Sequence, residues 1–273
     1  MRLAMAQIST GTDPDVNLTR IVAETERVAA DGVDLIVFPE ASMCRFGVSL
    51  TGVAQPLDGP WASRVVRLVN DTGVTVVAGM FTPSDDGRIR NTLLIARPGK
   101  PALGYDKIHL FDAFGFAESA TIAPGERTVI AEIAGRRVGF ATCYDIRFPE
   151  LFVELAARGA ELIVVPTSWG SGAGKLAQWE LLASARALDS GTTVVAVGQA
   201  LPDDPKVRDS GAPTGIGHSR ISDPFGSVIA DYDSGEQVGV HDIDLTRTDK
   251  ARAALATLAN RREIRSLDGT DAT

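Results

Sequence analysis

The chain has few of the features that mark secreted or nucleic-acid-binding proteins. Its 273 residues include only two cysteines and no cluster of Lys and Arg, and 35 acidic side chains against 27 basic ones give a formal charge of −8. Two cysteines exclude a disulfide framework. An acidic chain without a basic run also lacks the positive charge that a phosphate backbone requires. We therefore expect no nucleic-acid partner.

Long hydrophobic runs are missing as well. The apolar stretch near the N-terminus spans only residues 3–8, which is too short for the hydrophobic segment of a signal peptide. No later run approaches the roughly 18 apolar residues that cross a bilayer. The sequence therefore predicts a cytoplasmic protein with no membrane partner, in a compartment where thiols stay reduced.

The overall composition is that of an ordinary globular protein. Hydrophobic residues make up 44% of the chain and charged residues 23%, and a chain of this length can bury a large core without staples. No linker, repeat or low-complexity tract divides it. We expect one domain over residues 1–273, with a core at about 2–245 and a C-terminal helix and tail at 246–273.

Short apolar runs alternate with helical patterns, which is typical of an α/β protein. The runs rich in Val, Ile, Leu and Ala predict buried strands at 3–8, 33–38, 74–81, 92–96, 138–142, 162–165 and 193–198. Residues with three-to-four spacing predict helices at 18–29, 61–70, 147–158 and 176–190. A hairpin at Gly135 and antiparallel strands at 220–222, 227–232 and 238–243 add a mixed character to the sheet.

Cys143 stands where a predicted buried strand ends and a helix begins a few residues later. A nucleophile on such a corner projects from the sheet edge, close to backbone N–H groups that can hold an oxyanion. On this segment alone, a small apolar core residue at a strand end is the favoured explanation of Cys143. A catalytic thiol also needs a base. His109, His218 and His241 lie in no supporting motif, so we favour structural roles for them.

Carboxylates are the alternative bases. Glu40 follows Pro39 at the end of a buried strand, a position where open α/β sheets gather catalytic groups. Lys107 and Glu118 belong to a second polar segment. Each of these charged residues alone would be typical of a solvated loop end, but together with Cys143 they form a rarer pattern.

This pattern resembles the nitrilase, or carbon-nitrogen hydrolase, superfamily. The family's Glu, Lys and Cys motifs are matched in order by Phe38-Pro-Glu40, by Lys107-Ile-His-Leu-Phe-Asp112 with Glu118 behind it, and by Cys143-Tyr-Asp-Ile-Arg-Phe-Pro-Glu-Leu151. Later segments at 166–169, 178–187 and 217–226 fit as well. The resemblance covers residues 2 to 245 and rests on the joint order of the motifs.

The resemblance implies a four-layer αββα sandwich, with two mixed β-sheets face to face and helices on the outer faces. It implies that Cys143 is the nucleophile, Glu40 the general base and acid, Lys107 the stabiliser of the oxyanion, and Glu118 a second carboxylate that positions substrate or water. It requires no metal and no organic cofactor. Members commonly associate as homodimers through helices near the Cys143 corner, so we expect a homodimer or a higher homo-oligomer.

The residues after Cys143 are similar to those of ω-amidases and deaminated glutathione amidases, which implies a small carboxylated amide as substrate. We expect four substrate-binding residues. The backbone N–H of Tyr144 would complete the oxyanion site, and Phe116 and Trp169, like Phe114, either line the pocket or belong to the core. Arg147 either binds the substrate carboxylate or opens its helix and bonds to Glu150 or to backbone.

Other functions remain open at this point. Within the superfamily they are a nitrilase, an N-carbamoyl amidohydrolase or an acyl transferase. Outside it, the alternative is a non-catalytic protein that binds small molecules.

The segment 170–175 resembles a phosphate-binding loop but has three residues between its outer glycines instead of four, and Leu176 replaces the hydroxyl residue. We interpret it as a loop near the site. Cys44, without partners at ligand spacing, is interpreted as an ordinary thiol rather than a metal ligand.

Overall fold

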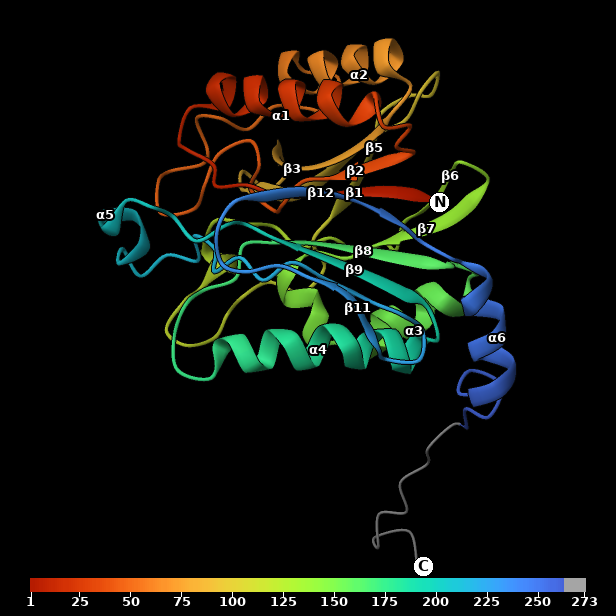
Figure 1. The fold of residues 1–273 in the computed structure, drawn as a ribbon. Helices are drawn as coiled ribbons and strands as arrows, with labels where there is room; N and C mark the ends of the chain where they lie inside the picture. The colour runs from red at the N-terminus through yellow and green to blue at the C-terminus, as the bar shows by residue number, and fades with distance from the viewer. Residues whose placement is uncertain (263–273) are drawn as a thin grey trace, which may run out of the picture.

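The computed structural model describes residues 1–262, so the last part of the expected C-terminal tail, 263–273, lies outside the described residues. Two six-stranded β-sheets lie face to face, with helices on their outer faces (Figure 1). This arrangement confirms the predicted αββα sandwich. Among the described residues, no helix has the length and apolar character needed to cross a bilayer.

Both sheets are mixed, as predicted. Each contains three neighbouring parallel strands flanked by antiparallel ones. The first sheet has, in spatial order, β12 (Gln237–Asp242), β1 (Arg2–Gln7), β2 (Leu35–Val37), β3 (Thr75–Pro83), β4 (Ile89–Ala96) and β5 (Leu103–Asp106). The second has β11 (Val228–Asp231), β10 (Arg220–Ser222), β9 (Thr193–Gly198), β8 (Leu162–Thr167), β7 (Arg136–Phe140) and β6 (Ile130–Ile133).

Helices cover the outer face of each sheet (Figure 1). The first sheet is covered by α1 (Pro14–Ala29) and α2 (Pro60–Thr72), and the second by α3 (Pro149–Ala157) and α4 (Lys175–Ser190). The short α5 (Pro205–Arg208) lies in a connecting loop, and the helix expected after residue 245 is α6 (Thr246–Leu255).

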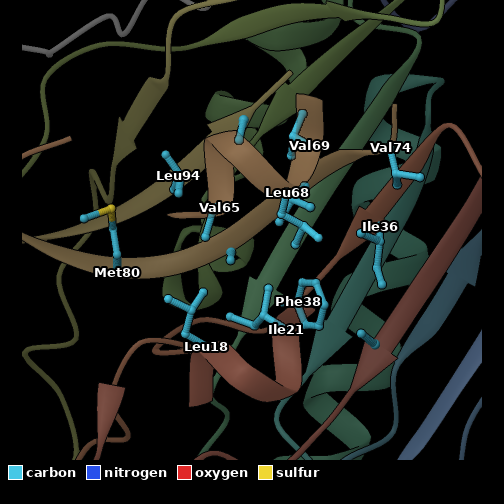
Figure 2. Packing of buried hydrophobic residues seen from close by; sticks show 14 of the residues in the cluster. Leu18, Ile21, Ile36, Phe38, Val65, Leu68, Val69, Val74, Met80 and Leu94 are labelled. Atoms are coloured by element: carbon cyan, nitrogen blue, oxygen red, sulfur yellow. The ribbon is translucent and has the colours of Figure 1, made fainter. Parts of the chain in front are cut away.

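Apolar side chains fill three layers. One cluster joins α1 and α2 to the first sheet, and Figure 2 shows Leu18 and Ile21 of α1 among Ile36, Phe38 and Val65. A second cluster fills the space between the sheets, and a third lies under α3 and α4. The sheets are therefore held apart by a filled core, and the ends of their strands are free to carry polar groups.

The helix expected at 147–158 begins later than predicted. A separate 3₁₀ turn runs from Cys143 to Arg147, and α3 begins only at Pro149. The reason is Phe148, which has φ −110° and ψ 92°, since the residue before a proline is excluded from the α-helical region by the proline ring. The interruption makes the Cys143 turn a unit of its own at the edge of the second sheet.

Candidate active site

The four residues predicted to carry the chemistry line one cavity of about 290 Å³. Glu40 lies three residues beyond β2, and Lys107 directly follows β5, both in the first sheet. Cys143 lies three residues beyond β7 of the second sheet, and Glu118 lies in a short 3₁₀ turn. The site is thus assembled across the two sheets from segments far apart in the sequence.

Lys107 stands between the two carboxylates. Its Nζ donates to Glu40 Oε1 at 3.1 Å and to the Glu118 oxygens at 2.8 and 3.1 Å. The lysine side chain is 2% exposed, and that of Glu40 is 1% exposed. In so dry a place the ammonium needs both carboxylates to offset the loss of its hydration.

Two further groups hold the carboxylates, and neither was among the predicted site residues. Asn91 of β4 donates from Nδ2 to Glu40 Oε1 at 2.7 Å and to Glu118 Oε1 at 3.3 Å. The backbone N–H of Ser168 donates to Glu40 Oε2 at 2.8 Å. Asn91 directly precedes the predicted strand 92–96, and Ser168 lay within the matched segment 166–169.

Burial shifts the proton affinities in the cluster. It raises the pKa of Glu40 above the ordinary carboxyl value, with Glu118 adding to the rise. Burial alone would lower the pKa of Lys107, but Glu40 and Glu118 outweigh it and hold that pKa well above its usual value. Burial, assisted by Glu40, also raises the pKa of Cys143 well above that of a free thiol. At neutral pH the resting cluster therefore holds a charged ammonium and a protonated thiol.

Two residues in or next to the cluster have a left-handed backbone conformation. Cys143 has φ 46°, and Ala41, directly after Glu40, has φ 58°. The left-handed region is uncommon for residues other than glycine, and such strain concentrates at functional sites. The Cys143 Sγ lies 3.8 Å from the carbonyl oxygen of Ser168. The nucleophile candidate therefore sits on a tight corner, as predicted from its place between strand and helix.

The predicted substrate-binding residues Tyr144, Arg147, Trp169 and Phe116 all line the same cavity. The guanidinium of Arg147 lies 5.2 Å from the ring centroid of Trp169 and 5.7 Å from that of Tyr144. Its Nη2 donates to Gln178 Oε1 of α4 at 2.6 Å, and not to Glu150 or to backbone as the structural alternative for Arg147 had it. Arg147 Nε is buried without a hydrogen-bond partner.

Lys175 is a second cation in the cavity lining; the sequence analysis considered it only as the end of a segment resembling a phosphate-binding loop and not as a substrate-binding residue. It ends the segment 170–175, which indeed lies near the site. Its Nζ stands 3.5 Å from the ring centroid of Phe114 and 5.3 Å from that of Phe111. Partial burial and the neighbouring Arg147 lower the pKa of Lys175. Two cations therefore face the cavity in addition to Lys107.

The histidines and the second cysteine have structural surroundings. His109 Nδ1 lies 2.7 Å from Asp145 Oδ1, and His241 Nε2 lies 2.8 Å from the hydroxyl of Tyr232. His218 accepts a hydrogen bond on its carbonyl from Trp179. Cys44 is buried in an apolar cluster, where burial raises the pKa of its thiol, as expected for an ordinary thiol. Within residues 1–262, no three His, Cys, Asp or Glu side chains are grouped to hold a metal ion.

Sequence comparisons relate the chain to a known enzyme family. The carbon-nitrogen hydrolase family model matches residues 2–253. A Mycobacterium tuberculosis protein named only as a hydrolase is 51% identical over 98% of both chains. The deaminated glutathione amidase of Escherichia coli O157:H7 is 35% identical over 86% of this chain and 87% of its own.

Solved structures support the same family assignment. A nitrilase-superfamily protein of branch 10 from Saccharomyces cerevisiae has a TM-score of 0.81 at 27% identity, over 93% of this chain and 94% of its own. An amidase variant from Nesterenkonia sp. AN1, with a covalent adduct on its active-site cysteine, has a TM-score of 0.79 at 25% identity, over 96% and 94%. The chain is therefore an enzyme of the carbon-nitrogen hydrolase family, within the nitrilase superfamily.

Proposed function

We propose that this enzyme hydrolyses the C–N bond of a small carboxylated amide through a thioester on Cys143. The observation that carries the proposal is the charge layout of the cavity. Cys143 lines it together with Glu40 and Lys107, and two further cations, Arg147 and Lys175, line it as well. Among residues 1–262, neither of these two cations forms an ion pair with an acidic side chain.

The first half of the reaction forms the thioester. Glu40 takes the proton of the Cys143 thiol as the sulfur attacks the amide carbon, and the carbonyl oxygen becomes an oxyanion. The charged Lys107, with the backbone N–H of Tyr144, stabilises that oxyanion. Glu40 then returns the proton to the nitrogen, the C–N bond breaks, and ammonia or an amine leaves.

The second half consumes water. Glu40 takes a proton from a water molecule, the hydroxide attacks the thioester carbon, and the C–S bond breaks to release the acid. The departing sulfur regains its proton from Glu40. Glu118, hydrogen-bonded to Lys107 and to the backbone N–H of Phe111 at 2.6 Å, keeps the ammonium in place and positions the water. No cofactor enters these steps.

The carboxylate of the substrate would bind Arg147 and Lys175. A guanidinium forms bidentate hydrogen bonds with a carboxylate, and the aromatic rings around it remove competing water. A local positive site is needed because the net charge of −8 repels an anionic substrate. The names of two relatives, deaminated glutathione amidase and mouse ω-amidase, favour an ω-amide of an α-keto acid or a deaminated-glutathione type of amide.

A matched panel of substrates tests the proposal. Each ω-amide carrying a terminal carboxylate is paired with its methyl ester, and ammonia release is measured for both, with Cys143→Ala as the blank. We expect kcat/KM to be at least about 10-fold higher for the acid, the effect of one charge-assisted hydrogen bond. Equal values for acid and ester would contradict the carboxylate preference.

The same panel separates the alternatives. Nitriles test a nitrilase, ureido acids an N-carbamoyl amidohydrolase, and an added amine with an amide donor tests an acyl transferase. The homodimer and the cytoplasmic location stay predictions, and sedimentation of the purified protein checks the first of them.

A further inference from the structure

Asp145 is a fully buried acid that no step of the proposed reaction uses. It lies two residues after Cys143, in the same 3₁₀ turn, and is 0% exposed. A carboxylate in such a place must be hydrogen-bonded, because an unpaired buried charge strongly destabilises a protein. Its partners therefore show what the residue is for.

Four donors surround the carboxylate of Asp145. Oδ2 accepts from the Thr142 N–H at 2.9 Å and from the Tyr105 hydroxyl at 2.7 Å. Oδ1 accepts from the backbone N–H of His109 at 2.9 Å and from its Nδ1 at 2.7 Å. Burial and Asp145 itself hold the pKa of Tyr105 well above its usual value, so the hydroxyl keeps its proton.

The positions of these donors are informative. Tyr105 and His109 stand two residues before and two residues after Lys107, in a segment that leaves the first sheet. Asp145 and Thr142 flank Cys143, at the edge of the second sheet. Hydrogen bonds to the Asp145 carboxylate therefore connect the residues on both sides of Lys107 with the residues on both sides of Cys143.

We propose that Asp145 is a positioning residue that sets the distance between Cys143 and the Lys107–Glu40 pair. The proposal rests on the roles given above to Cys143 and Lys107. Apolar packing between the sheets tolerates small shifts, whereas hydrogen bonds at 2.7–2.9 Å to a single carboxylate do not. Asp145 thus fixes the nucleophile of one sheet against the charged groups of the other.

Two tyrosine variants test the proposal. Tyr105→Phe removes one hydrogen bond to Asp145, and Tyr232→Phe removes a comparable buried hydroxyl, bonded to His241 at 2.8 Å and outside the cavity lining. We expect similar falls in melting temperature. Only Tyr105→Phe should lower kcat, by about 10-fold to 100-fold, the cost of misplacing a reacting group by up to an ångström. Its KM should stay within about twofold, because no substrate contact changes.

Two variants of His109 give an independent test. Both His109→Ala and His109→Asn remove the stacking of the ring on Phe148, whose centroid lies 3.7 Å away. Only Asn keeps an N–H donor near the place of Nδ1. We expect His109→Ala to lower kcat by about 10-fold or more and His109→Asn to restore most of it. Because this comparison relies on a rescue, it remains decisive if Tyr105→Phe fails to fold.

The single-turnover rate of acyl transfer to Cys143 should fall in parallel with kcat. The proposal is overturned if Tyr105→Phe loses no more kcat than Tyr232→Phe, or if His109→Asn is no better than His109→Ala. Activity surviving in Cys143→Ala would instead overturn the proposed function itself. Normal kcat in Tyr105→Phe beside an inactive Cys143→Ala would remove only the role of Asp145.

Discussion

Two unlike groups of residues line the cavity, and we call them the reaction cluster and the rim. The reaction cluster consists of Glu40, Lys107, Glu118 and Cys143, and the rim of Phe116, Arg147 and Lys175. Side chains of the cluster are buried, with Lys107 2% exposed and Glu118 11% exposed. Phe116 of the rim is 40% exposed. Rigid, dry groups suit chemistry, whereas accessible cations suit the capture of a substrate from water.

The hydrogen bonding differs in the same way. In the cluster, the carboxylate oxygens and the ammonium have partners from β4 and from the segments that follow β2, β5 and β8. In the rim, Arg147 bonds to a neutral amide, and Lys175 stacks on an aromatic ring. The charged groups of the cluster are therefore paired with one another within the protein, and the rim is open to an added anion. Changes in the cluster should act on kcat and changes in the rim on KM.

The largest effect should follow Lys107→Met. The variant removes the stabiliser of the oxyanion and leaves Glu40 and Glu118 without their common partner, so kcat should fall by about 10³-fold. The free energy of unfolding should also fall, by about 3–5 kcal/mol. Steady-state kinetics and denaturant unfolding measure the two effects, with the exposed Lys100→Met as control. A kcat within tenfold of the parent would show that Lys107 does not face the reacting oxygen.

Glu118→Gln should have the next largest effect. The amide keeps the size of the side chain but no longer balances the Lys107 charge or accepts as strongly from Phe111. We expect kcat to fall by about 10-fold to 100-fold with little change in KM. Glu126→Gln, at an exposed position, serves as control. A change confined to KM would move Glu118 from the cluster to the rim.

Residues of the site could be predicted from the sequence where a local pattern marks them, and not where their partners lie far away along the chain. Glu40 and Cys143 each follow a buried strand, which is a local pattern, and the order of the family's motifs along the chain assigned their roles. Asn91 was missed because its partners lie far along the chain, on the ends of other segments. The same holds for Asp145, whose neighbours in sequence say nothing of its bonds to the Lys107 segment.

Local chemistry also explains the error at α3 and the omission of Lys175. The periodic pattern at 147–158 outweighed the effect of Pro149 on Phe148, so the predicted helix began too early. Lys175 stood in a glycine-rich loop whose path no pattern determines, and only the folded structure shows that it lines the cavity. The fold class was predictable because alternating strands and helices and a matched family both point to it.

The pH dependence should identify Glu40 as the base. Since burial raises its pKa, kcat/KM should be highest where Glu40 is ionised and should fall tenfold per pH unit below its pKa. On acidification, kcat/KM should therefore begin to fall at a higher pH than it would if the base had the pKa of an ordinary carboxyl group. Asn91→Leu removes a hydrogen bond to the ionised form, so the fall should move to still higher pH. An unchanged profile in this variant would assign the ionisation to another group.

Arg147→Met should raise KM for carboxylated amides by about 10-fold to 100-fold, the cost of one charge-assisted interaction, with kcat nearly unchanged. Arg147→Lys should recover only part of the loss, because an ammonium lacks the planar fork. The methyl ester of the same substrate is the control, and its KM should not change. Equal losses for acid and ester would make Arg147 a structural residue that holds Gln178.

The smallest effect should follow Lys175→Met. This cation stacks on Phe114 at the exposed side of the cavity, where water screens its charge, so KM for the acid should rise by about threefold to tenfold. The effect should shrink at high salt, unlike that of Arg147→Met. A fall in kcat instead, for acid and ester alike, would mean that Lys175 belongs with the reaction cluster.

The most direct test of the central claim is to trap the intermediate on Cys143. The enzyme is mixed with a carboxylated amide, quenched in acid within one turnover, digested and examined by mass spectrometry. We predict that the peptide containing Cys143 gains the mass of the acyl group, that the peptide containing Cys44 does not, and that Cys143→Ala shows neither adduct nor ammonia release. Turnover by Cys143→Ala, or an adduct on Cys44 alone, would contradict the claim.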